Sequence, residues 1–306
     1  MHRLACATFV AVLAMIGATT ARASLHIFAC EPEWGALAKA LGGDDVDVFT
    51  ATAALQDPHQ IQARPSLISR LHNADLAICT GAELEIGWMP VLLRQASNGK
   101  VQPGTPGYFE AAQQVTLLEK PARLDRAEGD IHPAGNPHIQ TDPRNMRMVA
   151  AAFAKRLAQI DAPHAASYAQ RAQDFDAKLG AAIDRLAGQA GPLKGVKIVS
   201  YHRSWIYLMN WLGMTEAANI EPKPGVPPGS AYIADLLSKI PGLQARMILY
   251  AAYEDPKPSQ FVAEKSSIPA VMLPFTVGGS DGAKDLISLY EDTVKRLLAG
   301  LGGKGG

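Results

Sequence analysis

Residues 144–190 constrain the fold of this sequence more than any other stretch, because they contain few residues that break a helix. Apolar side chains recur there at spacings of three and four, namely Tyr168, Ala172, Phe175, Leu179, Ile183 and Leu186. This spacing predicts one long amphipathic helix, with a shorter helix over 145–160 in front of it. Such a helix divides the chain into two halves and connects them stiffly.

Both halves alternate short apolar runs with amphipathic stretches. We expect strands at 25–30, 46–51, 75–81, 196–202, 245–251 and 269–275, and helices at 32–43, 65–74 and about 283–301. Strands that alternate with helices predict a parallel sheet, and ligands bind such sheets at the carboxyl ends of their strands. The expected fold is therefore α/β, with two lobes that each hold a parallel β-sheet flanked by helices, joined by one long rigid helix.

The amino-terminal residues have the pattern of a secretory signal peptide. Arg3 precedes an apolar run over 4–16, and Ala21-Arg22-Ala23 predicts cleavage before Ser24. Leu4-Ala5-Cys6 resembles a lipoprotein box, but it stands before the apolar run instead of after it, so we expect no lipid anchor. The predicted organisation is a signal peptide (1–23), an amino-terminal lobe (24–160), a connecting helix (161–190) and a carboxyl-terminal lobe (191–306).

Two cysteines, Cys30 and Cys79, remain after removal of the signal peptide, and each ends an apolar, strand-like run. In an oxidising compartment they can form a disulfide that joins adjacent strands. Two buried free thiols are the alternative, and the sequence leaves both open. The 29 basic and 29 acidic residues balance, and no basic run occurs, so nucleic acid is not an expected partner.

Three histidines stand at or just beyond the ends of predicted elements. His59 follows the second strand in LQDPHQIQARPS, His138 precedes a helix in GNPHIQTDPRN, and His202 ends a strand in VSYHRSW. Each lies in a short polar or proline-bounded segment, which limits its conformational freedom. Neutral imidazoles held in this way are good ligands for Zn²⁺. Together they predict a metal site.

The sequence resembles a known family through fragments spread over nearly the whole mature chain. These are DPHQIQARPS, NADLAICTGAELEIGWMPVLL, NPHIQTDPRN, VSYHRSWIYLMNWLGM and EPKPGVPPGSAYIADLL. They resemble the periplasmic solute-binding proteins that deliver zinc or manganese to ABC importers. The resemblance implies two α/β lobes on a rigid helix, with His59 and His138 of the first lobe and His202 of the second as metal ligands.

The fourth ligand of that family is a carboxylate of the second lobe, and here the sequence departs from the pattern. Thr276 stands where an aspartate is common, and Asp281 in the glycine-rich GGSDG segment is the nearest carboxylate. We expect Asp281 to be the fourth ligand, with Glu254, Asp255 or water as alternatives. Asp281 can equally serve as the amino-terminal cap of the last helix.

Two further departures concern the second histidine motif. Asn136 and Gln140 replace the acidic and aromatic residues that are usual there. The long histidine-rich loop of many zinc-specific members is missing, and only His132 lies in the corresponding region. His132 is either an accessory metal ligand or an ordinary solvated histidine.

The resemblance implies a monomeric periplasmic protein that captures Zn²⁺ and hands it to an ABC permease in the inner membrane, with a periplasmic metallochaperone as a possible second partner. Three imidazoles and one carboxylate favour zinc, whereas manganese prefers more oxygen ligands. The alternatives are a zinc-dependent hydrolase and a periplasmic zinc chaperone on the same scaffold. The chain carries no HExxH helix or P-loop motif, so we expect no enzyme.

Overall fold

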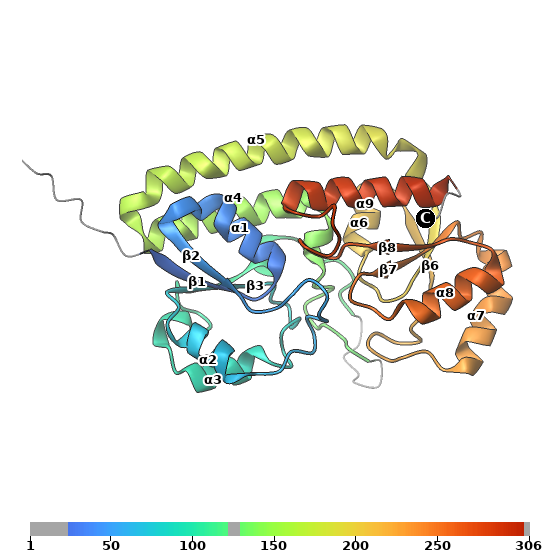
Figure 1. Cartoon of the computed structure of the whole chain (residues 1–306), viewed down its shortest axis with the longest axis horizontal. Coiled ribbons are helices and arrows are strands. Elements are labelled where there is room, and N and C mark those ends of the chain that lie inside the picture. The colour runs from blue at the N-terminus through green and yellow to red at the C-terminus, as the bar shows by residue number, and fades with distance from the viewer. Residues whose placement is uncertain (1–23, 122–128, 303–306) are drawn as a thin grey trace, which may run out of the picture.

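The computed structural model describes residues 24–121 and 129–302. The predicted signal peptide lies outside these residues. Two lobes stand side by side along the long axis of the molecule, each built on a four-stranded parallel sheet (Figure 1). The fold predicted from the alternation of strands and helices is thereby confirmed. Within the described ranges, no helix is long and apolar enough to cross a membrane.

The first lobe has the strand order β2-β1-β3-β4. Its strands are β1 (Leu25–Ala29), β2 (Val46–Thr50), β3 (Leu76–Cys79) and β4 (Tyr108–Glu110), and its helices are α1 (Pro32–Gly42), α2 (Pro65–His72) and α3 (Met89–Ala96). The parallel pairing places the carboxyl ends of all these strands at one edge of the sheet. That edge faces the second lobe.

The second lobe repeats this arrangement in the order β6-β5-β7-β8. Its strands are β5 (Lys197–Ser200), β6 (Thr215–Asn219), β7 (Met247–Ala251) and β8 (Ala270–Leu273), and its helices are α6 (Ile206–Leu212), α7 (Ser230–Leu243), α8 (Pro256–Ser266) and α9 (Leu286–Leu301). Loops that leave the carboxyl ends of both sheets meet between the lobes, where a ligand site is expected in folds of this kind.

The strands β4 and β6 are not among those predicted from the sequence. Both lie at the edge of a sheet, and their sequences YFE and TEAAN are short or polar. Most of their residues are half-buried or exposed, so neither strand carries the apolar run on which the prediction relied.

Two helices occupy the stretch predicted as the long connection. α4 (Pro143–Ile160) begins where the side chain of Asp142 accepts a hydrogen bond from Arg144 N, and α5 (Ala165–Gln189) follows after a short turn. Five of the six periodic side chains of α5 are buried, as the spacing predicts; Ala172 is half-buried. The division of the chain into lobes at residues 161 and 190 stays a prediction.

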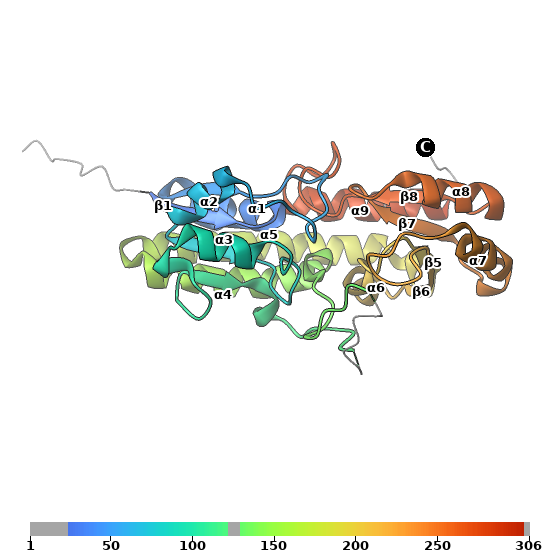
Figure 2. The same ribbon diagram turned by 90° about the horizontal axis from the view of Figure 1, so that it is seen from below.

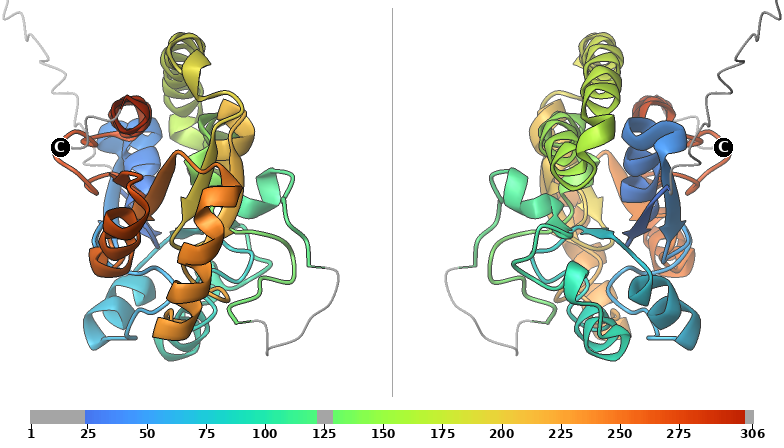
Figure 3. Two further views of the ribbon diagram at one scale, coloured as in Figure 1. Left: turned by 90° about the vertical axis from the view of Figure 1, so that its right-hand side faces the viewer. Right: turned by 90° about the vertical axis from the view of Figure 1, so that its left-hand side faces the viewer.

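The helix α5 runs along both lobes and ties them together. It packs against α1 of the first lobe and α9 of the second, and these two helices also touch each other (Figures 2 and 3). One buried cluster extends through both lobes and includes Trp34, Phe153, Leu179, Trp205 and Leu297. The lobes therefore share one core in addition to the helical connection, which resists large changes in their relative orientation.

A disulfide joins Cys30 to Cys79 at the carboxyl ends of β1 and β3, with their Cα atoms 4.8 Å apart. Glu85 is close enough to complete a group of three potential metal donors, but sulfurs joined to each other offer no thiolate. The Glu85 carboxylate instead accepts hydrogen bonds from the backbone N–H groups of Thr80 and Gly81. This contact fixes the loop that follows β3.

Two more carboxyl groups, those of Glu31 and Glu33, are buried in the segment that follows Cys30. Burial raises the pKa of Glu33 and of Glu85 to about 7. Burial also raises the pKa of Glu31, and the neighbouring charges of Glu85 and Glu33 add to the effect. The hydroxyl of Thr276 donates a hydrogen bond of 2.5 Å to Glu33, which links the loop after β8 to the first lobe.

We predict that Leu179→Ala lowers the free energy of unfolding by about 2–5 kcal/mol, because the Leu179 side chain is fully buried and its removal leaves a cavity in the core under α5. Urea denaturation of the metal-free protein measures the change. Lys178→Ala, at the exposed neighbouring position, serves as the control and should change stability by no more than about 0.5 kcal/mol. Equal losses in both variants would contradict a packed α5 interface.

We predict that Glu33→Gln stabilises the metal-free protein increasingly as pH rises from about 4.5 to 7, by about 1–3 kcal/mol at the plateau. The Glu33 pKa lies above its ordinary value of 4.5 in the folded chain. The folded state therefore binds more protons than the unfolded state in this range, and stability falls as pH rises. Glutamine removes the charge and keeps an oxygen that can accept from Thr276. A difference between variant and wild type that does not vary with pH would show that Glu33 titrates normally.

Candidate metal site

Three histidines meet between the lobes. One ring nitrogen from each of His59, His138 and His202 lies within 4.8 Å of the others, and no carboxylate of the described residues belongs to this group. His59 comes from the loop between β2 and α2, His138 from the segment before α4, and His202 from the end of β5. The structure thus brings together the three residues that the sequence singled out, with both lobes contributing.

Two of these histidines lie in the same local motif, Asx-Pro-His, which fixes their side chains. In Asp57-Pro58-His59, Asp57 Oδ1 accepts hydrogen bonds from His59 N (3.0 Å) and His59 Nδ1 (2.7 Å). In Asn136-Pro137-His138, Asn136 Oδ1 accepts the equivalent bonds from His138 at 3.0 and 2.8 Å. Asx side chains that bond two residues ahead form tight turns. The turn and the proline leave each imidazole little freedom.

His202 is oriented by a residue that is distant in sequence. Its Nδ1 lies 2.7 Å from Oε2 of Glu221. Glu221 follows β6, the strand that pairs with β5 in the same sheet. Gly225 N donates to the same oxygen at 3.0 Å. Gly225 has a φ of 74°, which glycine tolerates, and this allows the loop to turn back towards Glu221.

An oxygen acceptor at each Nδ1 places the ring proton there and leaves the lone pair on Nε2 free for a metal. The Nε2 atoms of His59 and His138 are buried, and neither has a hydrogen-bond partner among residues 24–121 and 129–302. An unpartnered buried nitrogen costs free energy, which a bound cation offsets.

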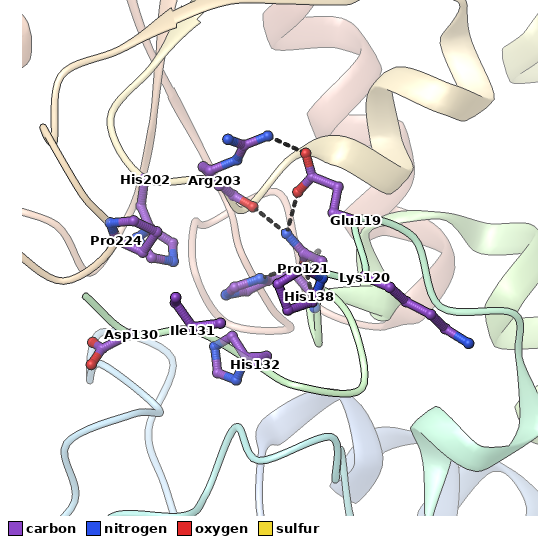
Figure 4. A pocket seen from close by; sticks show the side chains of 11 residues that line it. Glu119, Lys120, Pro121, Asp130, Ile131, His132, His138, His202, Arg203 and Pro224 are labelled. Atoms are coloured by element: carbon purple, nitrogen blue, oxygen red, sulfur yellow. Dashed lines mark hydrogen bonds and ion pairs between the residues drawn. The ribbon is translucent and has the colours of Figure 1, made fainter. Parts of the chain in front are cut away.

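A hydrogen-bond network extends from His138 across the lobe boundary. The amide nitrogen of Asn136 donates to Glu119 Oε2 (3.1 Å) and to the backbone carbonyl of Arg203 (2.8 Å). The guanidinium of Arg203 pairs with the other oxygen of Glu119 (Figure 4). Asn136 therefore couples the position of His138 in the first lobe to the residue next to His202 in the second.

Burial lowers the pKa of His138 well below its ordinary value of 6.5, and the like charges of His202 and His59 lower it further. For Asp57, burial acts to raise the pKa, but hydrogen bonds and the charge of His59 outweigh it and the pKa is lowered. The site thus keeps His138 neutral and Asp57 ionised near neutral pH, which are the protonation states that metal binding requires.

The spacing of the rings fits coordination to a single ion. Imidazoles bound tetrahedrally to one Zn²⁺, at Zn–N distances of about 2.1 Å, place their ring centroids roughly 5.2 Å apart. The centroids of His59, His138 and His202 are 5.3–5.5 Å apart. Small adjustments are enough to bring all three nitrogens to a common centre.

None of the carboxylates considered as the fourth ligand joins the three donors. Asp281 is exposed on the loop between β8 and α9. Its alternative role as a helix cap is not realised either, because Asp285 caps α9. Asp255 caps α8, and Glu254 Oε2 accepts a hydrogen bond from Ala251 N. Thr276, at the position expected for an aspartate, bonds to Glu33.

His132 lies next to the three histidines. Its ring centroid is 5.7 Å from that of His59 and 6.3 Å from that of His138. Burial lowers its pKa to about 3, with a further decrease from the charges of His59 and His202. His132, His138 and His202 line one pocket of ≈ 460 Å³ (Figure 4). His132 is therefore part of the site's surroundings and not a freely solvated side chain.

Sequence reasoning missed two residues that orient the imidazoles, Asp57 and Glu221. The repetition of Asx-Pro-His at 57–59 and 136–138 was a signal that identifies Asp57. Glu221 carries no local signal, because it reaches His202 only through the pairing of β5 with β6.

The sequence matches a protein-family model described as periplasmic zinc-uptake complex component A, over residues 27–300. The chain belongs to this family. The family's members are components of uptake complexes and not enzymes, which agrees with the sequence prediction that the chain is no enzyme. The family assignment covers both lobes and all three site histidines.

Several relatives carry zinc or manganese in their names. The high-affinity zinc uptake system protein ZnuA of Brucella abortus (strain 2308) is 29% identical over 165 residues, which is 54% of this chain and 48% of that protein, so the match spans about half the relative's length. The ZnuA of Paracoccus denitrificans (strain Pd 1222) is 26% identical over 89% of this chain and 87% of its own. The manganese ABC transporter substrate-binding lipoprotein PsaA of Streptococcus anginosus is 21% identical over 92% of each.

Among solved structures, a crystal structure of ZnuA superposes with a TM-score of 0.74 at 22% sequence identity, and covers 91% of this chain and 100% of the other. The likeness supports the two-lobe fold.

We predict that Asp57→Ala lowers zinc affinity about 10–100-fold, because it releases the Nδ1 contact that orients His59. Competition with a chelating dye measures the affinity. Asp47→Ala is the matched control, since it removes a carboxylate 3.2 Å from the exposed His26, outside the site. A loss of equal size in the control, or none in Asp57→Ala, would contradict the orienting role.

Proposed function

We propose that this protein binds one Zn²⁺ reversibly between its lobes through His59, His138 and His202. The observation that carries the proposal is the convergence of three imidazoles from both lobes, each fixed through Nδ1 by an oxygen acceptor. A site made in this way is preorganised, so little conformational entropy is lost when the ion binds. Protons compete with the metal, so affinity falls as pH decreases through the range in which the imidazoles protonate.

Zinc is the metal that these donors favour. Imidazole nitrogen suits Zn²⁺, whereas Mn²⁺ prefers oxygen ligands, and the described residues bring nitrogens and no carboxylate to the centre. The names of the Brucella and Paracoccus relatives agree with zinc. The manganese protein among the relatives makes the metal the first property to measure.

The cell-biological role follows from family membership and the predicted signal peptide. We propose that the mature chain acts in the periplasm as a monomer, without a lipid anchor, and delivers zinc to the permease subunit of an ABC importer in the inner membrane. A periplasmic metallochaperone that loads it is a further proposed partner. The shared core and α5 limit lobe rotation, so release is assigned to movement of the loops that carry the histidines.

We predict that His138→Ala lowers zinc affinity by roughly a hundredfold or more, about 2.7 kcal/mol, because it removes a buried ligand that the network around Asn136 holds in place. Dye competition and metal analysis of the dialysed protein measure the loss. His72→Ala is the control, since His72 on α2 bonds to the Ala96 carbonyl away from the site. Unchanged zinc binding in His138→Ala would refute the proposed site.

A further inference from the structure

Four imidazoles, and not three, surround the space between the lobes. Five of the six pairs among His59, His132, His138 and His202 have ring centroids 5.3–6.3 Å apart. The longest of these five separations exceeds the roughly 5.2 Å expected around tetrahedral zinc by about 1 Å. A four-imidazole centre requires the His132 segment to move inward, towards His138 and His202.

The His132 ring has no competing use. Both of its nitrogens are buried, and neither makes a hydrogen bond within the part of the chain that the structure describes. The backbone of Ala82 lies near the ring but does not meet hydrogen-bond geometry. Two buried ring nitrogens without partners are uncommon in folded proteins and require an explanation. A metal ion bound to one of the two nitrogens explains that nitrogen.

The segment that carries His132 is fastened at both ends. On one side, Asp130 N donates to Pro224 O (2.9 Å), and Gly129 packs so closely that an added Cβ would lie 2.3 Å from the same oxygen. On the other side, Asn136 N donates to Leu118 O (2.8 Å). The Pro224 contact ties the segment to the loop that positions Glu221, so the second lobe helps to hold the segment in place.

The carboxylates near the histidines already have partners. Asp57 and Glu221 each bond to an Nδ1, and Glu119 pairs with Arg203. A carboxylate that left these contacts to bind the metal would release the imidazole or the cation that it holds. Glu254 Oε1 and both ring nitrogens of His132 are buried without a partner among the described residues. Of these two residues, His132 is the one whose ring contacts the rings of His59 and His138.

From these observations we propose that His132 is the fourth zinc ligand, in place of the family's carboxylate, and that the resulting all-nitrogen site discriminates against Mn²⁺. The proposal rests on the proposed zinc-binding function and specifies its ligand set. It replaces the expectation that Asp281 completes the site. Substitution of an oxygen donor by a fourth imidazole favours borderline-soft zinc over harder manganese.

X-ray absorption at the zinc edge, together with dye competition, tests the proposal on zinc-loaded wild type, His132→Ala and Asp281→Ala. We expect four imidazole nitrogens in the wild type and in Asp281→Ala, with equal affinities. In His132→Ala we expect three imidazoles and one oxygen, with affinity at least roughly tenfold lower, or about 1.4 kcal/mol. His132→Asp should restore tight zinc binding and should increase the affinity for Mn²⁺ relative to Zn²⁺ at least tenfold compared with the wild type. Restored zinc binding in His132→Asp would also show that the loss in His132→Ala is not caused by misfolding.

Three imidazoles and one oxygen in the wild type, with His132→Ala unchanged, would overturn the assignment of His132 and leave zinc binding intact. Loss of affinity in Asp281→Ala but not in His132→Ala would assign the fourth position to Asp281. A wild-type protein that takes up no zinc would overturn both this inference and the proposed function.

Discussion

The hydrogen bond that each site imidazole makes through Nδ1 is the interaction on which the rest of the site depends. Asp57, Asn136 and Glu221 each supply the accepting oxygen, and each fixes both the tautomer and the direction of one ring. Without these contacts the histidines would still be near one another, but their Nε2 lone pairs would not converge. The same contacts occupy the nearby oxygen donors, which leaves nitrogen to bind the ion.

Metal binding also requires a stable distance between the donors of the two lobes, and the two-lobe architecture provides it. The common core, α5, and the Thr276–Glu33 bond hold the lobes together. The Asn136–Arg203 bond does the same beside the metal site. Because these links restrict rotation of the lobes, the loops that carry the histidines determine the geometry of the metal site. Small movements of these loops are sufficient to change the coordination of a bound ion.

The parts of the structure that the sequence predicts correctly have strong local signals. The buried strands and α5 follow from apolar runs and periodicity, and the three histidines stand out because each lies beside a strand or helix end. The edge strand β6 and the role of Glu221 depend on long-range pairing, so no local pattern reveals them. The position of Asp281 is hard to derive from the sequence for a related reason. A glycine-rich segment is compatible with many paths, and only the folded chain shows that the Asp281 carboxylate lies outside the group of three histidines. The sequence leaves two roles open for His132, and the proposal that it binds metal depends on its closeness to the other rings in the folded chain.

The central claim is that one metal ion is enclosed by imidazoles from both lobes and that this ion is zinc. Native mass spectrometry of the wild-type protein, after equilibration with equal concentrations of Zn²⁺ and Mn²⁺, tests it most directly. The account predicts a single population that carries one zinc ion per chain. A population that carries manganese, more than one zinc ion at comparable affinity, or no metal would contradict it.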